Sequence, residues 1–261
     1  MKKLAIAKQI CTLSIVGLML FSCSKNDSDN PLEPIKDGKR LSKIETDVDN
    51  YMEFKYTNGA LTELVDVSGG ELSRSTITYH NNRPVEVRHS DGKIKFVYED
   101  DRLVKEELYA TDAQTANAYN QYVYQGNQVK EVTGYGLLES EVPYFKRKMF
   151  YNPNGEVERV EIYTVNDEDE LELSIKTSYE YDNKTNPYAT SAGNYLALFT
   201  QTYSRHNVVK ETTVDETGEL HQVITTSYTY DKDGYPLTAI EKTVNNGGDP
   251  VTVNKKFIYV P

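Results

Sequence analysis

The chain has 261 residues, with 29 Lys and Arg against 40 Asp and Glu, which gives a formal net charge of −11 at pH 7. This excess of acidic side chains argues against nucleic acid and against anionic lipid surfaces as partners, because both attract clusters of Lys and Arg. Aromatic residues are also unevenly used, with 21 tyrosines and no tryptophan.

The N-terminal segment has the features of an export signal. Lys2 and Lys3 precede an apolar run over residues 10–20, which is shorter than the ~20 residues that a membrane-spanning helix needs. The sequence Leu-Phe-Ser-Cys that follows at residues 20–23 resembles the lipobox of bacterial lipoprotein signals. The resemblance implies cleavage before Cys23 and acylation of that cysteine. An ordinary secretory signal and an uncleaved anchor are the alternatives.

The predicted organisation is a signal peptide over residues 1–22, a flexible tether over 23–40 after the acylated cysteine, and a repeat domain over 41–261. The tether is polar, and its acidic residues resemble the surface-export signals of Bacteroidota lipoproteins, although a plain linker explains them equally well. We therefore expect an outer-membrane lipoprotein exposed at the cell surface, with the periplasmic face as the alternative. Cleavage leaves one cysteine, so the mature chain would have no internal disulfide.

Residues 228–237 contain two tyrosines at i and i+2, and degraded copies of this unit, most of which keep only the second tyrosine, recur along the repeat domain. Both tyrosines of a copy would point to the same face of a strand. Recurrence every 19–30 residues is typical of stacked supersecondary units. The second tyrosines, which we call the anchor tyrosines, are Tyr56, Tyr79, Tyr98, Tyr124, Tyr151, Tyr181, Tyr203, Tyr230 and Tyr259.

Each anchor tyrosine except the last is followed after five or six residues by an apolar return residue that would open the next strand. Pairs such as Asn58-Gly59 and Asp233-Gly234 stand between the two and suit tight hairpin turns. Return strands then alternate apolar and charged residues, as at Val157, Val160 and Ile162. The return residues are Leu61, Pro84, Leu103, Val129, Val157, Pro187, Val208 and Pro236.

These patterns predict an all-β fold: a repetitive antiparallel β-hairpin meander that forms an elongated or curved sheet. Helical periodicity is nearly absent, with two exceptions. Residues 111–120 form an insertion, and residues 190–200 contain a segment that would form one short helix over a sheet edge.

Tyr-Xaa-Tyr-Asp followed by a glycine turn, as at 228–231 with Gly234, is similar to the YD or RHS-type repeat. The segment 181–188 also resembles uncharacterised Bacteroidota lipoproteins of domain-of-unknown-function families. The resemblance covers most of residues 41–261 and implies architecture without chemistry. Encapsulation, as in RHS proteins, is not implied, because the cage and toxin regions of those proteins are missing.

Motifs of enzymes and of metal sites are absent from the sequence, including paired cysteines and phosphate loops. His80, His89, His206 and His221 lie in separate copies without ligand spacing. The acidic stretch 166–170 and the turn 231–234 offer oxygens for calcium, but a solvated hairpin tip and a plain turn explain them more simply. We therefore expect no catalytic residues, no metal and no cofactor.

Tyrosine is the one side chain in surplus, and its flat apolar face with a polar tip suits stacking on sugars or a protein interface. The anchor tyrosines are explained as a ladder on the apolar face of the sheet. Tyrosines outside that phase are the predicted ligand-binding residues: Tyr119, Tyr135, Tyr144 and Tyr195.

The predicted function is a non-catalytic, lipid-anchored envelope protein that acts as a binding or scaffold module, with glycan as the leading ligand. A protein-interaction partner of an envelope complex is the second reading. A glycan hydrolase is the third, because acidic residues are numerous enough to supply a catalytic pair.

Overall fold

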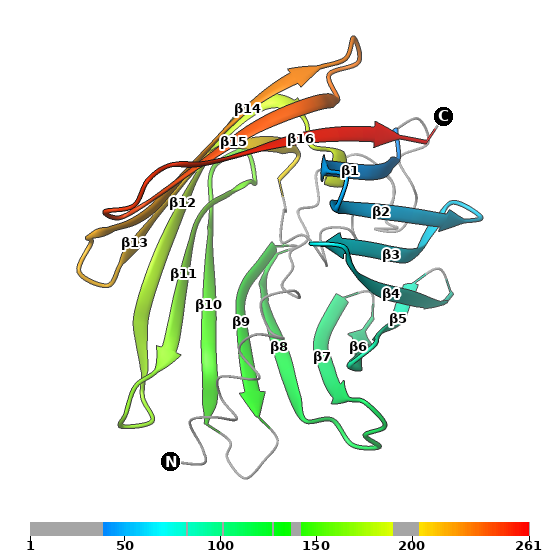
Figure 1. The fold of residues 1–261 in the computed structure, drawn as a ribbon. Helices are drawn as coiled ribbons and strands as arrows, with labels where there is room; N and C mark the ends of the chain where they lie inside the picture. Colours follow the sequence, from blue (N-terminus) through cyan, green and yellow to red (C-terminus); the bar gives the residue numbers. More distant parts are fainter. Residues whose placement is uncertain are drawn as a thin grey trace.

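The computed structural model describes residues 39–81, 83–100, 102–126, 128–136, 142–189 and 204–260. The fold is a closed barrel in which each strand is antiparallel to the next, and β1 pairs with β16 (Figure 1). The strands are β1 Leu41–Asp47, β2 Asn50–Thr57, β3 Ala60–Ser68, β4 Glu71–His80, β5 Arg83–His89, β6 Gly92–Glu99, β7 Arg102–Ala110, β8 Ala118–Gln125, β9 Gln128–Gly136, β10 Pro143–Tyr151, β11 Val157–Val165, β12 Leu171–Thr185, β13 His206–Asp215, β14 Leu220–Tyr230, β15 Pro236–Asn245 and β16 Val251–Tyr259.

The prediction of an open, elongated or curved sheet is therefore wrong, although the antiparallel meander itself is present. Closure comes from Leu41, which pairs with Tyr259 as a return residue pairs with its anchor tyrosine. The first strand thus supplies the return strand that the last copy lacks, and β1 and β16 lie side by side (Figure 1). Pro187 was also misassigned, because it begins a short 3-10 helix, Pro187–Ala189, instead of a strand. The predicted helix at 190–200 lies outside the described residues.

The hairpin turns after the anchor tyrosines have the expected backbone. Asn58 and Gly59 have φ values of 51° and 85°, as a two-residue loop between the paired Thr57 and Ala60 requires. These turns define one end of the barrel, which we call the tyrosine end. The opposite end carries the turns that follow β1, β3, β5, β7 and their counterparts.

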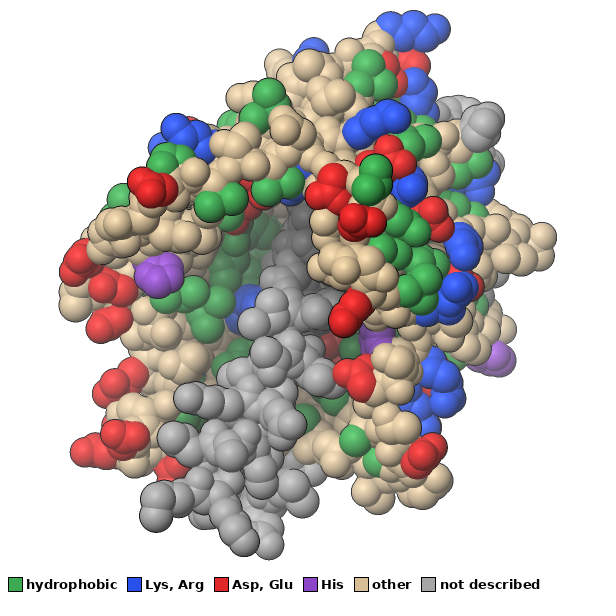
Figure 2. Space-filling view, in the orientation of Figure 1, with side chains coloured by type: hydrophobic (Ala, Val, Ile, Leu, Met, Phe, Trp, Pro, Cys, Tyr) green, Lys and Arg blue, Asp and Glu red, His purple; other side chains and the backbone are tan. Residues whose placement is uncertain are grey.

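The inner wall of the barrel is largely apolar, although it also carries charged groups such as the ion pair of Lys255 with Glu241. One cluster of buried side chains joins residues from β1 to β11 and from β15 and β16, including Leu41, Phe54, Val87, Val132 and Phe257. A cluster that unites strands around the whole ring must lie inside it, and Figure 2 shows hydrophobic side chains on the inner wall. The next residues along each strand, such as Lys55 beside Phe54, therefore face outward.

Most anchor tyrosines make the same contact. The hydroxyl of each donates a hydrogen bond to the backbone carbonyl of the return residue in the preceding copy, with O···O distances of 2.6–2.9 Å. Because that carbonyl belongs to a neighbouring hairpin, each bond ties one repeat to the next. The pairs are Tyr56 with Leu41, Tyr79 with Leu61, Tyr98 with Pro84, Tyr124 with Leu103, Tyr151 with Val129, Tyr181 with Val157 and Tyr259 with Pro236.

The interior also holds a carboxyl group. Glu106 of β7 has 1% of its surface exposed, and its Oε2 accepts a hydrogen bond of 3.0 Å from Asn120 on β8. Burial raises the pKa of Glu106 from 4.5 to about 7, because an ionised carboxylate is poorly solvated there.

We predict that Tyr98→Phe lowers the free energy of unfolding by about 1–2 kcal/mol, because it leaves the Pro84 carbonyl without its donor while keeping the ring packed. Tyr135→Phe, on the outer face of β9, is the matched control and should leave stability unchanged. Urea unfolding of the two variants measures the difference. Equal stability of both variants and the wild type would show that the hydroxyl bonds contribute nothing.

A second prediction concerns pH. Glu106 is harder to ionise in the folded state, so its contribution to stability is complete below its unfolded pKa of 4.5 and is lost as the pH rises to about 7. The loss is on the order of 3 kcal/mol, since each pH unit between the two pKa values is worth about 1.4 kcal/mol. Glu106→Gln should remove this slope from the unfolding free energy, whereas Glu107→Gln on the outer face should keep it. A slope that survives in Glu106→Gln would refute the assignment.

Candidate functional site

The structure separates the four predicted ligand-binding tyrosines. Tyr119 and Tyr135 are neighbours on the outer face, Tyr144 lies on β10, and Tyr195 lies outside the described residues. Tyr119 and Tyr135 belong to strands β8 and β9. The ring of Tyr144 meets the ring of Phe145 edge to face, with centroids 5.0 Å apart.

Tyr119 and Tyr135 form a stacked pair with ring centroids 4.8 Å apart and an interplanar angle of 16°. The Nζ of Lys105 lies 4.5 Å from the centroid of Tyr119. Because an ammonium and a second ring already lie against Tyr119, this pair presents mainly its ring edges and hydroxyl tips to solvent. It therefore offers hydrogen-bonding groups and a partial apolar surface instead of an open stacking platform.

Tyr109 continues this surface on β7. It pairs with Lys93 across the sheet, and Glu107, two residues earlier on the same face, pairs with Tyr119. The ammonium groups of Lys93 and Lys95 each lie 5.0 Å from the Tyr109 centroid. We call Tyr109, Tyr119 and Tyr135 with their lysines the outer aromatic strip.

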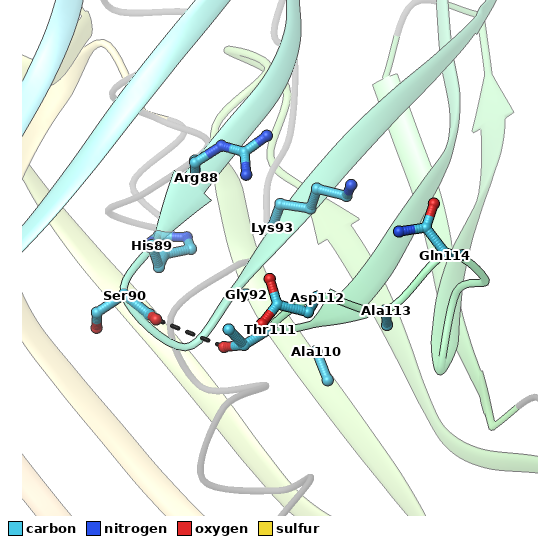
Figure 3. A pocket seen from close by; sticks show the side chains of 10 residues that line it. All are labelled: Arg88, His89, Ser90, Gly92, Lys93, Ala110, Thr111, Asp112, Ala113 and Gln114. Carbon is cyan, nitrogen blue, oxygen red and sulfur yellow. Dashed lines mark hydrogen bonds between the residues drawn. The ribbon is translucent and has the colours of Figure 1, made fainter.

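A cavity of about 330 Å³ adjoins the strip at the end of the barrel opposite the tyrosine end (Figure 3). It lies between the β5–β6 turn and the β7–β8 loop, and the Thr111 hydroxyl donates to the Ser90 carbonyl across it at 3.5 Å. Gly92 lets β6 approach β7 closely, because a Cβ there would lie 2.2 Å from the Tyr109 carbonyl oxygen. Its described lining is Arg88, His89, Ser90, Gly92, Lys93, Ala110, Thr111, Asp112, Ala113 and Gln114.

The lining is polar and partly charged. Arg88 and Lys93 are its cations, and Asp112 is the one carboxylate in its described part. Burial lowers the pKa of His89, against the opposing effect of the Asp91 carboxylate, and its Nδ1 lies 2.7 Å from the Ser75 hydroxyl. A single carboxylate does not supply the pair that glycoside hydrolysis requires. The cavity can hold a polar ligand by hydrogen bonds and charge.

A second polar cluster lies near the tyrosine end. Ser204 donates to Oε1 of the buried Glu156 at 2.9 Å, and His206 Nδ1 lies 2.7 Å from the same oxygen. In a catalytic triad the imidazole stands between the hydroxyl and the acid, whereas here both groups meet one carboxylate oxygen. The cluster therefore holds the start of β13 against the end of the β10–β11 turn.

Sequence reasoning missed the cavity and this cluster. Each depends on residues from different copies that only the register brings together. Arg88 and Lys93 carried one detectable signal, since they flank a tight turn, each two residues from Ser90-Asp91.

The described residues contain no group of three or more His, Cys, Asp or Glu side chains placed to hold a metal ion. The turn 231–234, considered above for calcium, instead uses Asp231 to bind the Lys39 ammonium and the backbone N–H groups of Asp233 and Tyr235. Within the same described ranges, no helix has the length and apolar character needed to cross a membrane.

No protein-family model matches the sequence, and no curated protein matches it either. Solved structures do share the fold. A porin-like protein from Bacteroides vulgatus matches with a TM-score of 0.57 at 11% identity, covering 86% of this chain and 100% of that one. A porin-like protein from Bacteroides uniformis matches with a TM-score of 0.58 at 13% identity, covering 84% of this chain and 96% of that one. At these identities the likeness establishes a shared barrel fold.

Proposed function

We propose that this chain is a non-catalytic binding module of the cell envelope, tethered to the outer membrane by a lipid on Cys23. In this proposal the barrel stands in water at the cell surface and binds glycans in the cavity and along the outer aromatic strip. Three features support it: the charge of the outer face, the position of the cavity, and the chemistry of the cavity lining.

Charged side chains cover much of the described outer face (Figure 2). Lys55 and Arg74 both contact Glu63, Lys146 lies 3.1 Å from Glu131, and further such pairs occur on other strands. A Lys or Arg facing lipid costs about 2–4 kcal/mol at the middle of a bilayer. The outward charges together with the apolar inner wall therefore favour a barrel surrounded by water, and they argue against a membrane-spanning pore.

Lys39, which precedes β1, lies at the tyrosine end and binds Asp231. The cavity lies at the other end. A membrane anchor reached through the tether would therefore leave the cavity facing away from the membrane, accessible to extracellular polymers. The periplasmic face of the outer membrane remains the alternative location.

The cavity lining is the observation that carries glycan binding. Arg88, Asp112 and Gln114 present planar polar groups that can donate to and accept from the hydroxyls of a sugar. Tyr109 and the stacked Tyr119 and Tyr135 continue the surface with amphipathic rings. A polar cavity beside half-buried aromatic rings matches the mixed polarity of a carbohydrate better than that of an apolar ligand.

A protein partner is the second candidate, favoured by large apolar side chains that are exposed on the last strands. Ile240 and Val251 are 52% and 56% exposed, and Leu220 is 44% exposed. Exposed apolar side chains that lie close together can form part of a protein interface.

We predict that Asp112→Asn and Gln114→Ala weaken glycan binding about fivefold or more without changing the melting temperature, because each removes hydrogen-bonding capacity from an exposed loop. Asn tolerates the left-handed backbone of residue 112, whose φ is 61°. Gln125→Ala at the tyrosine end is the control. A glycan array followed by calorimetry gives the measurement, and undiminished binding by both loop variants would remove the cavity from the site.

A separate prediction concerns the anchor and the solvent. A chain with residues 1–38 deleted should remain monodisperse and folded in buffer without detergent, because its outer face is charged. The full chain should incorporate labelled fatty acid, and Cys23→Ala should not. A deletion variant that stays folded only in detergent would refute the water-exposed barrel, and labelling of Cys23→Ala would refute the anchor.

A further inference from the structure

On the outer wall, charged residues of neighbouring described strands lie opposite residues of the opposite charge. Where two charged residues are direct partners in the register, a cation almost always meets a carboxylate, as cross-strand electrostatics favours. The opposite-charge partners are Lys43 and Glu53, Glu45 and Lys256, Lys55 and Glu63, Glu86 and Lys95, Lys95 and Glu107, Glu99 and Arg102, Glu131 and Lys148, Lys148 and Glu161, Glu161 and Lys176, and Glu180 and Lys210.

One direct pair within the described ranges breaks this rule. Arg88 of β5 stands opposite Lys93 of β6, and both side chains point to the outer face. Like charges in direct register destabilise a sheet. Arg88 and Lys93, whose like charges destabilise this part of the sheet, both line the cavity (Figure 3).

We propose that the cavity binds an anionic group, a carboxylate or sulfate carried by an acidic glycan, between Arg88 and Lys93. The proposal rests on the glycan-binding function above and specifies its ligand class. A bound anion would convert the unfavourable Arg88–Lys93 opposition into two attractive contacts.

The neighbouring groups leave both cations able to bind. One guanidinium nitrogen of Arg88 contacts Glu86 at 2.7 Å, and the side chain is 61% exposed, so its other donors remain available for a planar anion. In the part of the chain that the structure describes, Lys93 rests on the Tyr109 ring instead of on a carboxylate.

Two further carboxylates, Asp112 in the lining and Asp91 in the turn, lie near this pair. They limit the positive potential, so binding should depend on direct contacts with the anion more than on long-range attraction. His89 is half-buried with a lowered pKa and therefore contributes a neutral hydrogen-bonding group.

The test compares polymers that differ only in charge. Dextran and dextran sulfate form one pair, and methyl-esterified and free polygalacturonate form the other, so the two arms separate sulfate from carboxylate. Wild type, Arg88→Gln, Lys93→Gln and the control Lys242→Gln are titrated by calorimetry. Lys242 is suitable because it also lies outward on a strand without a carboxylate opposite, between Thr225 and Thr252 on the far part of the ring.

We expect the wild type and Lys242→Gln to prefer at least one anionic polymer over its neutral partner about tenfold or more, and Lys93→Gln and Arg88→Gln to lose that preference. Lys93→Gln should also raise the melting temperature slightly, since it removes the like-charge opposition. If glycans bind but all four proteins treat charged and neutral polymers alike, the anion site is refuted while glycan binding stands. If no glycan of any kind binds the wild type, both proposals fail.

Discussion

The hydrogen bond from an anchor tyrosine to the carbonyl of the preceding return residue is the contact on which this barrel depends. It places a rigid ring against the inner wall at the end of nearly every second strand and satisfies a backbone acceptor at the start of the neighbouring hairpin. Because each bond reaches from one copy to the next, the set couples neighbours around the ring. Burial of these rings raises their pKa values, so the hydroxyls stay protonated donors at physiological pH.

Among the described anchor tyrosines, Tyr230 does not donate to the carbonyl of a return residue. Beside the start of β13, Tyr230 donates to Asp182, and Tyr228 donates to the Val208 carbonyl at 3.1 Å in its place. Asp182 also accepts from Asn207, whose side chain binds the Lys184 carbonyl. Side chains thus replace the regular bond where the hairpin is interrupted.

Anchor tyrosines and aliphatic residues point inward. The outward positions carry the charge pairs and the outer aromatic strip. This inversion of the pattern expected for a lipid-facing barrel is the basis for the water-exposed module proposed here. It also makes the like-charge pair of Arg88 and Lys93 conspicuous. The alternation of inward and outward side chains along the strands therefore determines both the core of the barrel and the residues of the site.

Strand order and the inward phase of the anchor tyrosines could be predicted from the sequence, because both follow from the local period and from the turn residues. Closure could not, since it depends on Leu41 meeting Tyr259, and no local pattern links the two chain ends. Tyr119 and Tyr135 were picked out because they lie outside the anchor phase, but only the register shows that they stack on each other. The cavity likewise needs the register that sets Arg88 against Lys93.

A disulfide between β1 and β16 would test directly whether the ring is closed. Glu45 and Lys256 are direct partners on the outer face of β1 and β16, so cysteines at both positions would lie within bonding distance in a closed barrel. In a variant that lacks Cys11 and Cys23, we expect a rapid intramolecular disulfide in the folded monomer. Free thiols or only intermolecular dimers under the same oxidation would contradict the closed barrel.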